Sequence, residues 1–262
     1  MSIILVYQMG KVGSKTVVDS LVGTGFKRID HQAEKRLQQA IEQGQNIVVH
    51  CHAHESTRSI LDYCRTREML NQVRVISLVR EILPRNMSSF FQNFDKPGKR
   101  NWYFGPKKKI QHTSIKRLSI FFRKCNLRYV EKRICNWPQK FSDATGFQML
   151  DHAFDTARGF SSYETDDGLR LYFCQTEMLT ARWDSLRDYL ELDTLPMIPS
   201  NVGDDKWYAD IYARFKEAYV ASDRELTACY DNDIMDHFYS ESDLDRFRER
   251  WSGRNTDRAS AA

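Results

Sequence analysis

Short apolar segments alternate with amphipathic segments along the first eighty residues. Short runs rich in apolar and β-branched residues predict strands, and apolar residues at helical spacing predict helices between them. The predicted strands are residues 3–7, 26–29, 46–50 and 73–79. The predicted helices start at residue 16 and end near Gly23 or Gly25, then cover residues 33–43 and 59–70. This alternation is typical of a parallel sheet with helices on both faces, whose sites lie at the carboxyl ends of the strands.

The second half of the chain adds one strand and two helices to this pattern. Residues 168–174 predict a strand, residues 179–190 a helix, and residues 206–221 an amphipathic helix. In that last segment the apolar positions recur at i, i+4, i+8 and i+11, namely Trp207, Ile211, Phe215 and Ala218. The length of 262 residues and the hydrophobic fraction of 41% suit one compact α/β domain, which we expect to cover residues 1–252. Residues 253–262 are predicted to form a disordered tail.

Positive charge is concentrated in one segment, residues 95–140. Fourteen lysines and arginines lie between Lys96 and Lys140 with a single acid, Glu131. The rest of the chain has 25 basic and 34 acidic residues, a balance of −9. We therefore expect a helical basic insert that steers an anionic partner, although a solvated basic helix accounts for the same pattern.

Cysteine spacing and hydropathy exclude several classes of protein. The six cysteines contain no C-x-x-C pair, so a zinc ribbon or a dithiol redox motif is not indicated. Scattered thiols fit a reducing compartment. The apolar start Ser2 to Tyr7 is too short to span a bilayer, and no later run approaches that length. These patterns predict a cytoplasmic protein without a transmembrane segment.

A glycine-rich turn separates the first strand from the first helix. Glycines let backbone amides approach an oxyanion, and a helix N-terminus favours negative charge. Cationic and hydroxyl side chains add further donors. The segment differs from the Walker A pattern, because its glycines are three residues apart and one residue separates the second glycine from the following lysine. The predicted binding residues of this turn are Lys11, Val12, Gly13, Ser14, Lys15 and Thr16.

A second anion anchor is predicted where the strand at residues 73–79 ends. Arg80 follows this strand, and Ser88 comes eight residues later, on a predicted helix. An arginine supplies a fork of donors and a serine supplies a hydroxyl, so the two can hold one phosphate from two sides.

These two motifs together resemble those of the nucleotide-dependent sulfotransferases. Lys11 to Thr16 resembles the turn that binds the 5′-phosphosulfate in that family, and Arg80, Ser88 and Phe90 resemble its 3′-phosphate site at the same spacing. The resemblance implies a P-loop-type, three-layer α/β fold with a central parallel sheet. It also implies 3′-phosphoadenosine-5′-phosphosulfate (PAPS) as the sulfuryl donor and adenosine 3′,5′-bisphosphate (PAP) as the product, with no metal required.

The C-terminal half resembles a narrower group, bacterial proteins of capsular polysaccharide synthesis. That group carries an Asn/Asp-Lys-Trp-Tyr-Ser-like signature, and residues 205–209 read Asp-Lys-Trp-Tyr-Ala, with Ala209 in place of the serine. The resemblance implies that Lys206 reaches the nucleotide. It also implies a carbohydrate or glycoconjugate acceptor, which the basic insert would suit if the acceptor is anionic.

Histidines follow the strand at residues 46–50, in the sequence His50-Cys51-His52-Ala53-His54-Glu55. In an extended chain the three imidazoles share one face. The family places a general base here, which takes the proton of the acceptor hydroxyl. His52 is the first candidate and His54 the second, while His50 and the Glu55 carboxylate stay open. The resemblance gives Lys11 a catalytic role as well, because charge develops on the leaving phosphate beside it.

Other functions remain open at this point. A kinase that uses the same turn would need an acidic metal-holding residue at a strand end, where Arg80 stands instead. A non-catalytic nucleotide- or glycan-binding protein fits the same motifs. A basic, aromatic segment also fits nucleic acid, although we expect no stable nucleic-acid partner. The sequence does not define the oligomeric state or the acceptor.

Overall fold

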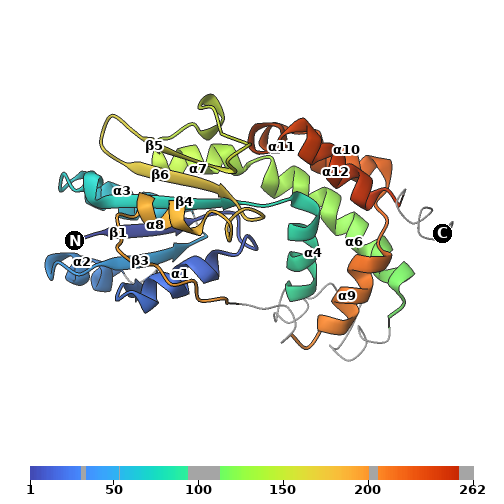
Figure 1. Ribbon diagram of the computed structural model, residues 1–262, viewed down its shortest axis with the longest axis horizontal. Coiled ribbons are helices and arrows are strands. Elements are labelled where there is room, and N and C mark those ends of the chain that lie inside the picture. Colours follow the sequence, from blue (N-terminus) through green and yellow to red (C-terminus); the bar gives the residue numbers. More distant parts are fainter. Residues whose placement is uncertain (31–33, 53, 94–112, 201–205, 254–262) are drawn as a thin grey trace. The chain divides into compact units, whose positions relative to one another are not determined.

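Segments that are far apart in the chain combine into two units in the computed structural model (Figure 1). The structure describes residues 1–30, 34–52, 54–93, 113–200 and 206–253. Met1–Arg80 and Trp137–Asn201 form the first unit, called the sheet unit here. Glu81–Asn136 and Val202–Ala262 form the second, called the helical unit. Much of the predicted basic insert, residues 94–112, and the predicted tail from residue 254 lie outside the described residues.

A six-stranded sheet in the order β2-β3-β1-β4-β6-β5 is the centre of the sheet unit. Its strands are β1 (Ile3–Tyr7), β2 (Lys27–Ile29), β3 (Ile47–Cys51), β4 (Val73–Val79), β5 (Phe160–Glu164) and β6 (Arg170–Gln175). The first four and β6 are parallel, with Ile3 of β1 paired to Ile47 and to Val73. The edge strand β5 runs antiparallel to β6. The predicted α/β fold with a central parallel sheet is confirmed.

Helices cover both faces of this sheet and create three layers. The helices of the sheet unit are α1 (Ser14–Gly23), α2 (Glu34–Glu42), α3 (His54–Arg65), α7 (Trp137–Thr145) and α8 (Trp183–Tyr189). On one face, Ile4 and Val6 of β1 belong to a buried cluster with side chains of α1 and α8. On the other face, the Tyr7 ring lies 4.9 Å from that of Trp137 and 5.4 Å from that of Phe141, both on α7. Alternate residues of β1 thus face opposite layers, as strand geometry requires.

The helical unit is built around a cluster of aromatic side chains. Its helices are α4 (Ile82–Asn93), α6 (Ile115–Tyr129), α9 (Ala209–Ala218), α10 (Asp223–Tyr230), α11 (Asp233–Phe238) and α12 (Glu241–Trp251), and a π-helical turn, η2 (Val130–Ile134), extends α6. The Phe215 ring of α9 lies 5.2 Å from that of Phe91 and 5.5 Å from that of Phe122. The described part of the basic insert is therefore helical, as predicted.

Two predicted helices differ in their bounds from the structure, and one strand was not predicted. The helix predicted at 59–70 is α3, which begins at His54 and ends at Arg65. The helix predicted at 206–221 is shorter, and its buried stripe runs through Tyr208, Ile211, Phe215 and Tyr219, whereas Trp207 is half-buried and Ala218 exposed. The antiparallel strand β5 was not predicted. Its sequence, Phe-Ser-Ser-Tyr-Glu, carries too few apolar residues to indicate a strand.

The cysteine and hydropathy patterns have simple structural counterparts. All six cysteines are free thiols, and four of them, at 51, 64, 174 and 229, are buried. Within the described residues, no helix combines the length and the apolar character that crossing a membrane requires.

Candidate functional site

The turn between β1 and α1 has an unusual backbone. Gly10, Lys11 and Gly13 all adopt positive φ angles, of 73°, 65° and 81°. Glycine adopts this left-handed region without penalty, but a residue with a Cβ pays about 1–2 kcal/mol. Strain of this kind is concentrated at binding and catalytic sites. Lys11 therefore occupies a conformation that folding alone does not favour.

Donors behind the turn fix its carbonyl groups. The Thr176 hydroxyl donates to the Val12 carbonyl at 2.8 Å, and the Arg80 guanidinium donates from Nη1 to the Lys11 carbonyl at 3.0 Å. The Val12 side chain is fully buried and anchors the turn in the core. With these carbonyls engaged, the first N–H groups of α1, at Ser14 and Lys15, are the backbone donors that this end of the helix offers to a ligand.

The two glycines also keep space open around the turn. Gly13 is the N-cap of α1 and has no side chain to cap the helix. A Cβ at Gly13 would meet Cγ2 of Thr176 at 3.4 Å, and a Cβ at Gly10 would meet the His52 ring at 3.7 Å. A helix N-terminus that is uncapped and approached by a glycine turn suits an oxyanion.

The polar side chains of the turn already have local partners. The Ser14 hydroxyl lies 2.9 Å from Nε2 of His50. The exposed Lys15 ammonium lies 3.7 Å from the Asp19 carboxylate, one helical turn along α1. The Thr16 hydroxyl accepts a hydrogen bond from the Ser200 N–H at 3.4 Å. These contacts pre-position the side chains, and an exposed ion pair such as that of Lys15 contributes little to stability.

The site lies where the direction of the chain across the sheet reverses. The chain leaves β1 toward β2 at one edge, and it leaves β4 toward β6 and β5 at the other, while β1 and β4 are neighbours. Ligands of open α/β sheets bind at the carboxyl ends of strands at such a point. The glycine turn follows β1 and Arg80 follows β4, so the structure brings the two predicted anchors of the sheet unit together here.

The histidine run does not stay extended, which corrects one expectation. His50 is the fourth residue of β3, His52 follows the strand, and His54 begins α3, so the three imidazoles do not share one strand face. The His50 and His52 rings lie 4.3 Å apart in an edge-on arrangement. His54 instead contacts the Glu55 carboxylate, with Nε2 3.1 Å from Oε1.

His50 and His52 make different contacts with the turn. His50 contacts Ser14 and also lies 3.5 Å from the Gln8 side-chain amide. Nδ1 of the exposed His52 lies 3.5 Å from the Gln8 carbonyl. A proton donated from Nδ1 to that carbonyl places the lone pair on Nε2, the form that a general base needs. His50 therefore holds the turn, while the geometry of His52 suits proton transfer.

The thiol between these histidines is chemically inert. Burial raises the pKa of the Cys51 thiol to about 12, against a smaller lowering effect of its hydrogen bond with Thr57. Burial also raises the pKa of Tyr7, at the end of β1, well above its ordinary value. Both groups are neutral at physiological pH, which excludes a thiolate nucleophile at Cys51.

Two predicted binding residues belong to the helical unit. Ser88 is half-buried on α4, and Lys206 is half-buried just before α9. Their contacts with a nucleotide remain predictions, as does the joint hold of Arg80 and Ser88 on one phosphate. The described residues contain no cluster of three or more histidine, cysteine or acidic side chains that could hold a metal ion.

Sequence reasoning missed Thr176 and Gln8. Thr176 directly follows β6, and its N–H donates to the Val79 carbonyl at 2.7 Å while its hydroxyl supports the turn. A polar residue directly after a predicted parallel strand was the available signal. Gln8 is fully buried, and only its position between the strand and the first glycine marked it.

Comparisons with known proteins found a structural match but no match to a protein family or a curated protein. A solved structure that matches is mouse sulfotransferase SULT7A1 complexed with PAP, at 12% sequence identity and a TM-score of 0.43. The match covers 98% of this chain and 86% of that one.

Proposed function

We propose that this protein is a PAPS-dependent sulfotransferase that transfers a sulfuryl group to a hydroxyl of a carbohydrate or glycoconjugate. The observation that carries the proposal is the hydrogen bond from Arg80 to the Lys11 carbonyl, at 3.0 Å. It places a guanidinium at the same carboxyl edge as the glycine turn. A donor with phosphate groups at both its 5′ and 3′ positions needs two cationic holds close together, which this arrangement supports.

The residues of the turn fit the 5′ end of such a nucleotide. Left-handed glycines at 10 and 13 keep Cβ atoms away, and the start of α1 offers backbone N–H groups. When bound, PAPS supplies the activated sulfuryl group and a phosphate leaving group. Lys11 would stabilise the negative charge that develops on that phosphate, and its fixed left-handed backbone limits the rearrangement needed to do so.

Arg80 would bind the 3′-phosphate with the guanidinium N–H groups that do not donate to the Lys11 carbonyl. A guanidinium has five N–H donors, and the Lys11 carbonyl takes one. Ser88 and Lys206 would add a hydroxyl and an ammonium from the helical unit, on the strength of the motif resemblance alone. The same arginine would thus support the turn and recognise the nucleotide.

His52 would accept the proton of the acceptor hydroxyl. The position of Nδ1 near the Gln8 carbonyl supports Nε2 as the basic atom. His54, within α3 and next to Glu55, is the second candidate. General-base catalysis of this kind contributes about 10²–10⁴ in rate.

The test compares two labelled donors on the full chain. The protein is incubated with ³⁵S-labelled PAPS or γ-³²P-labelled ATP, together with a panel of bacterial capsular polysaccharides. We expect ³⁵S to enter the carbohydrate fraction and Lys11→Ala to abolish the transfer. Transfer of ³²P instead would establish a kinase. Tight binding of PAP without transfer from either donor would establish a non-catalytic binding protein.

A further inference from the structure

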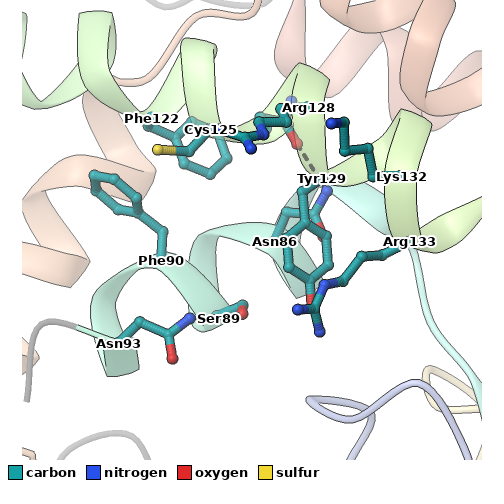
Figure 2. Close-up of a pocket in the computed structure, with 11 residues that line it drawn as sticks. Asn86, Ser89, Phe90, Asn93, Phe122, Cys125, Arg128, Tyr129, Lys132 and Arg133 are labelled. Carbon is teal, nitrogen blue, oxygen red and sulfur yellow. Dashed lines mark hydrogen bonds between the residues drawn. The ribbon is translucent and has the colours of Figure 1, made fainter. Parts of the chain in front are cut away.

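The helical unit contains a pocket of its own, which the proposed transfer chemistry does not use. Its volume is about 380 Å³, within the range of small-molecule sites. Residues of α4, α6 and η2 line it, all within the helical unit. Figure 2 shows Phe90 and Phe122 on one side and Lys132 and Arg133 on the other, with Tyr129 between them. The remaining lining residues are Asn86, Ser89, Asn93, Cys125, Asn126 and Arg128.

Among the residues that the structure describes, the charged side chains that line the pocket are all cationic. Arg128, Lys132 and Arg133 line it and are exposed, and no carboxylate is among its described lining residues. The buried Glu225 carboxylate contacts the lining residue Asn126 but is already paired with the Arg123 guanidinium at 2.8 Å. The pocket therefore has a cationic rim without a local counter-charge in its lining, which favours an anionic ligand.

Buried hydrogen bonds hold the floor of the pocket in place. The Asn86 amide donates to the Asn126 side-chain oxygen at 2.8 Å, and the Asn126 amide donates to Glu225 at 3.3 Å. The Arg85 guanidinium, itself almost fully buried, donates to Asn86 at 2.8 Å and to the Tyr129 hydroxyl at 3.2 Å. A floor with satisfied polar groups is pre-organised and binds a ligand without first reordering its side chains.

Tyr129 lines the pocket and lies close to two arginines. The Arg85 and Arg133 guanidinium carbons lie 4.8 Å and 5.5 Å from its ring centroid. Burial by itself raises the pKa of the Tyr129 phenol, but Arg85, Arg133 and a hydrogen bond with Ser89 together lower it below its ordinary value. The same positive environment that stabilises a phenolate stabilises a carboxylate or sulfate in its place.

We propose that this pocket binds an acidic sugar residue, a pyranose ring that carries one carboxylate or sulfate group. The oxyanion would pair with Lys132 and the fork of Arg133, and the amide of Asn93 would meet ring hydroxyls. The edge of Phe90, which is 7% exposed, would pack on the apolar C–H face of the ring, with the buried Phe122 ring behind it. If the proposed function holds, such a residue belongs to the acceptor, but binding at the pocket requires no nucleotide.

Calorimetric titration of the full chain with defined sugars tests the proposal. The probes are a hyaluronan tetrasaccharide, which carries carboxylates, and N-acetylglucosamine 6-sulfate; neutral chitotetraose is the control ligand. We expect at least one acidic probe to bind, with chitotetraose at least tenfold weaker than the tetrasaccharide. Equal affinity for the neutral and acidic tetrasaccharides, or binding of neither acidic probe, would overturn the proposal.

Matched double variants locate the binding. The double variant Lys132→Ala, Arg133→Ala should bind the acidic probe at least tenfold more weakly than the wild type. Lys116→Ala with Lys124→Ala removes the same charge from exposed positions of α6 outside the pocket lining and should change affinity less than threefold. Tyr129→Phe keeps the ring but removes the hydroxyl, and should weaken binding severalfold. If the two double variants lose equal affinity for the acidic probe, the binding is general electrostatic attraction, and the proposed site is refuted.

Two further titrations separate this proposal from its alternatives. The first is a titration with a single-stranded RNA 12-mer. If the RNA binds more tightly than the tetrasaccharide and loses affinity in the Lys132 and Arg133 double variant, the ligand of the pocket is nucleic acid and the sugar proposal is refuted. PAP binding is measured on the same wild-type protein. Sugar binding without PAP binding would refute the proposed function but support the sugar site. PAP binding without sugar binding would refute the sugar site but support the proposed function.

Discussion

Arg80 carries two roles in the proposed site, and its substitution separates them. The guanidinium supports the turn through the Lys11 carbonyl, at 3.0 Å, and would also bind the 3′-phosphate of the nucleotide. Replacing Arg80 with alanine removes both contacts. Replacing it with lysine keeps one charge but loses the planar fork that serves two partners at once.

The expected loss follows from these contacts. A hydrogen bond that involves a charged group contributes about 1.5–3 kcal/mol, and each 1.4 kcal/mol is a factor of ten in affinity. Arg80→Ala should therefore weaken PAP binding about 10- to 100-fold. The nucleotide 5′-AMP lacks the 3′-phosphate, so only the loss of the Arg80 contact with the turn affects its binding. Its affinity should therefore fall less, by about a factor of five or below. The ratio of the PAP affinity to the 5′-AMP affinity should therefore drop at least about twofold.

Calorimetric titration of the wild type, Arg80→Ala and Arg80→Lys with PAP and with 5′-AMP measures both effects. Arg28→Ala is a suitable control, because Arg28 is an exposed arginine of the same unit whose contact is an ion pair with Asp19 at 3.7 Å. Equal weakening of the two nucleotides by Arg80→Ala would limit Arg80 to support of the turn. No weakening of either nucleotide would refute both roles.

Three further variants or conditions test other parts of the account. Gly13→Ala forces a Cβ onto a φ of 81° and to 3.4 Å from Thr176, so we expect about 1–2 kcal/mol lower unfolding free energy in urea and weaker PAP binding. His52→Ala should abolish sulfuryl transfer, measured with ³⁵S-PAPS, while leaving the affinity for PAP within about threefold. Burial raises the pKa values of Cys51 and Cys64 to about 12 and 11, so the folded state keeps protons that the unfolded chain loses above pH 9. These thiols should not change stability below about pH 8, and Cys51 should lower it by roughly 1–2 kcal/mol at pH 10, measured by urea unfolding.

Each of these predictions has its own control. Gly25→Ala is matched to Gly13→Ala, because Gly25 also has a positive φ, of 96°, but lies after α1 and has open space around its Cβ. It should lower stability without a specific effect on PAP. Near-normal turnover in His52→Ala would exclude His52 as the base and direct attention to His54. Cys51→Ala should show a shallower loss of stability above pH 9, and an unchanged pH slope would contradict the linkage.

Local patterns predicted the centre of the fold well. Residues 73–79 form β4 with the predicted bounds, because this central strand is buried along its whole length and five of its seven residues are apolar. The edge of the sheet was harder to predict. The strand β5 is half polar and depends on pairing with β6, such as Ser161 with Phe173, which no local pattern records. The error in predicting which residues at the start of α9 are buried has the same origin. Packing within the helical unit, and not spacing alone, buries Tyr208 rather than Trp207.

The site was predicted as a set of residues but not as a geometry. The glycine turn and Arg80 were recognisable because polar, glycine-bearing segments directly follow buried strands. The start of α3 at His54 could not be recognised from the sequence. Because His54 lies in this helix, it does not share a strand face with His50 and His52 as predicted. Support of the turn by Thr176 joins residues 164 positions apart, a contact that only the folded sheet creates.

The proposed function depends on one interaction: the glycine turn and Arg80 together bind a nucleotide that carries a 3′-phosphate. Titration of the full chain with PAP, ADP and ATP under identical conditions measures it directly. We expect PAP to bind at least tenfold more tightly than ADP or ATP, because only PAP carries the 3′-phosphate. Equal or tighter binding of ATP would contradict this expectation.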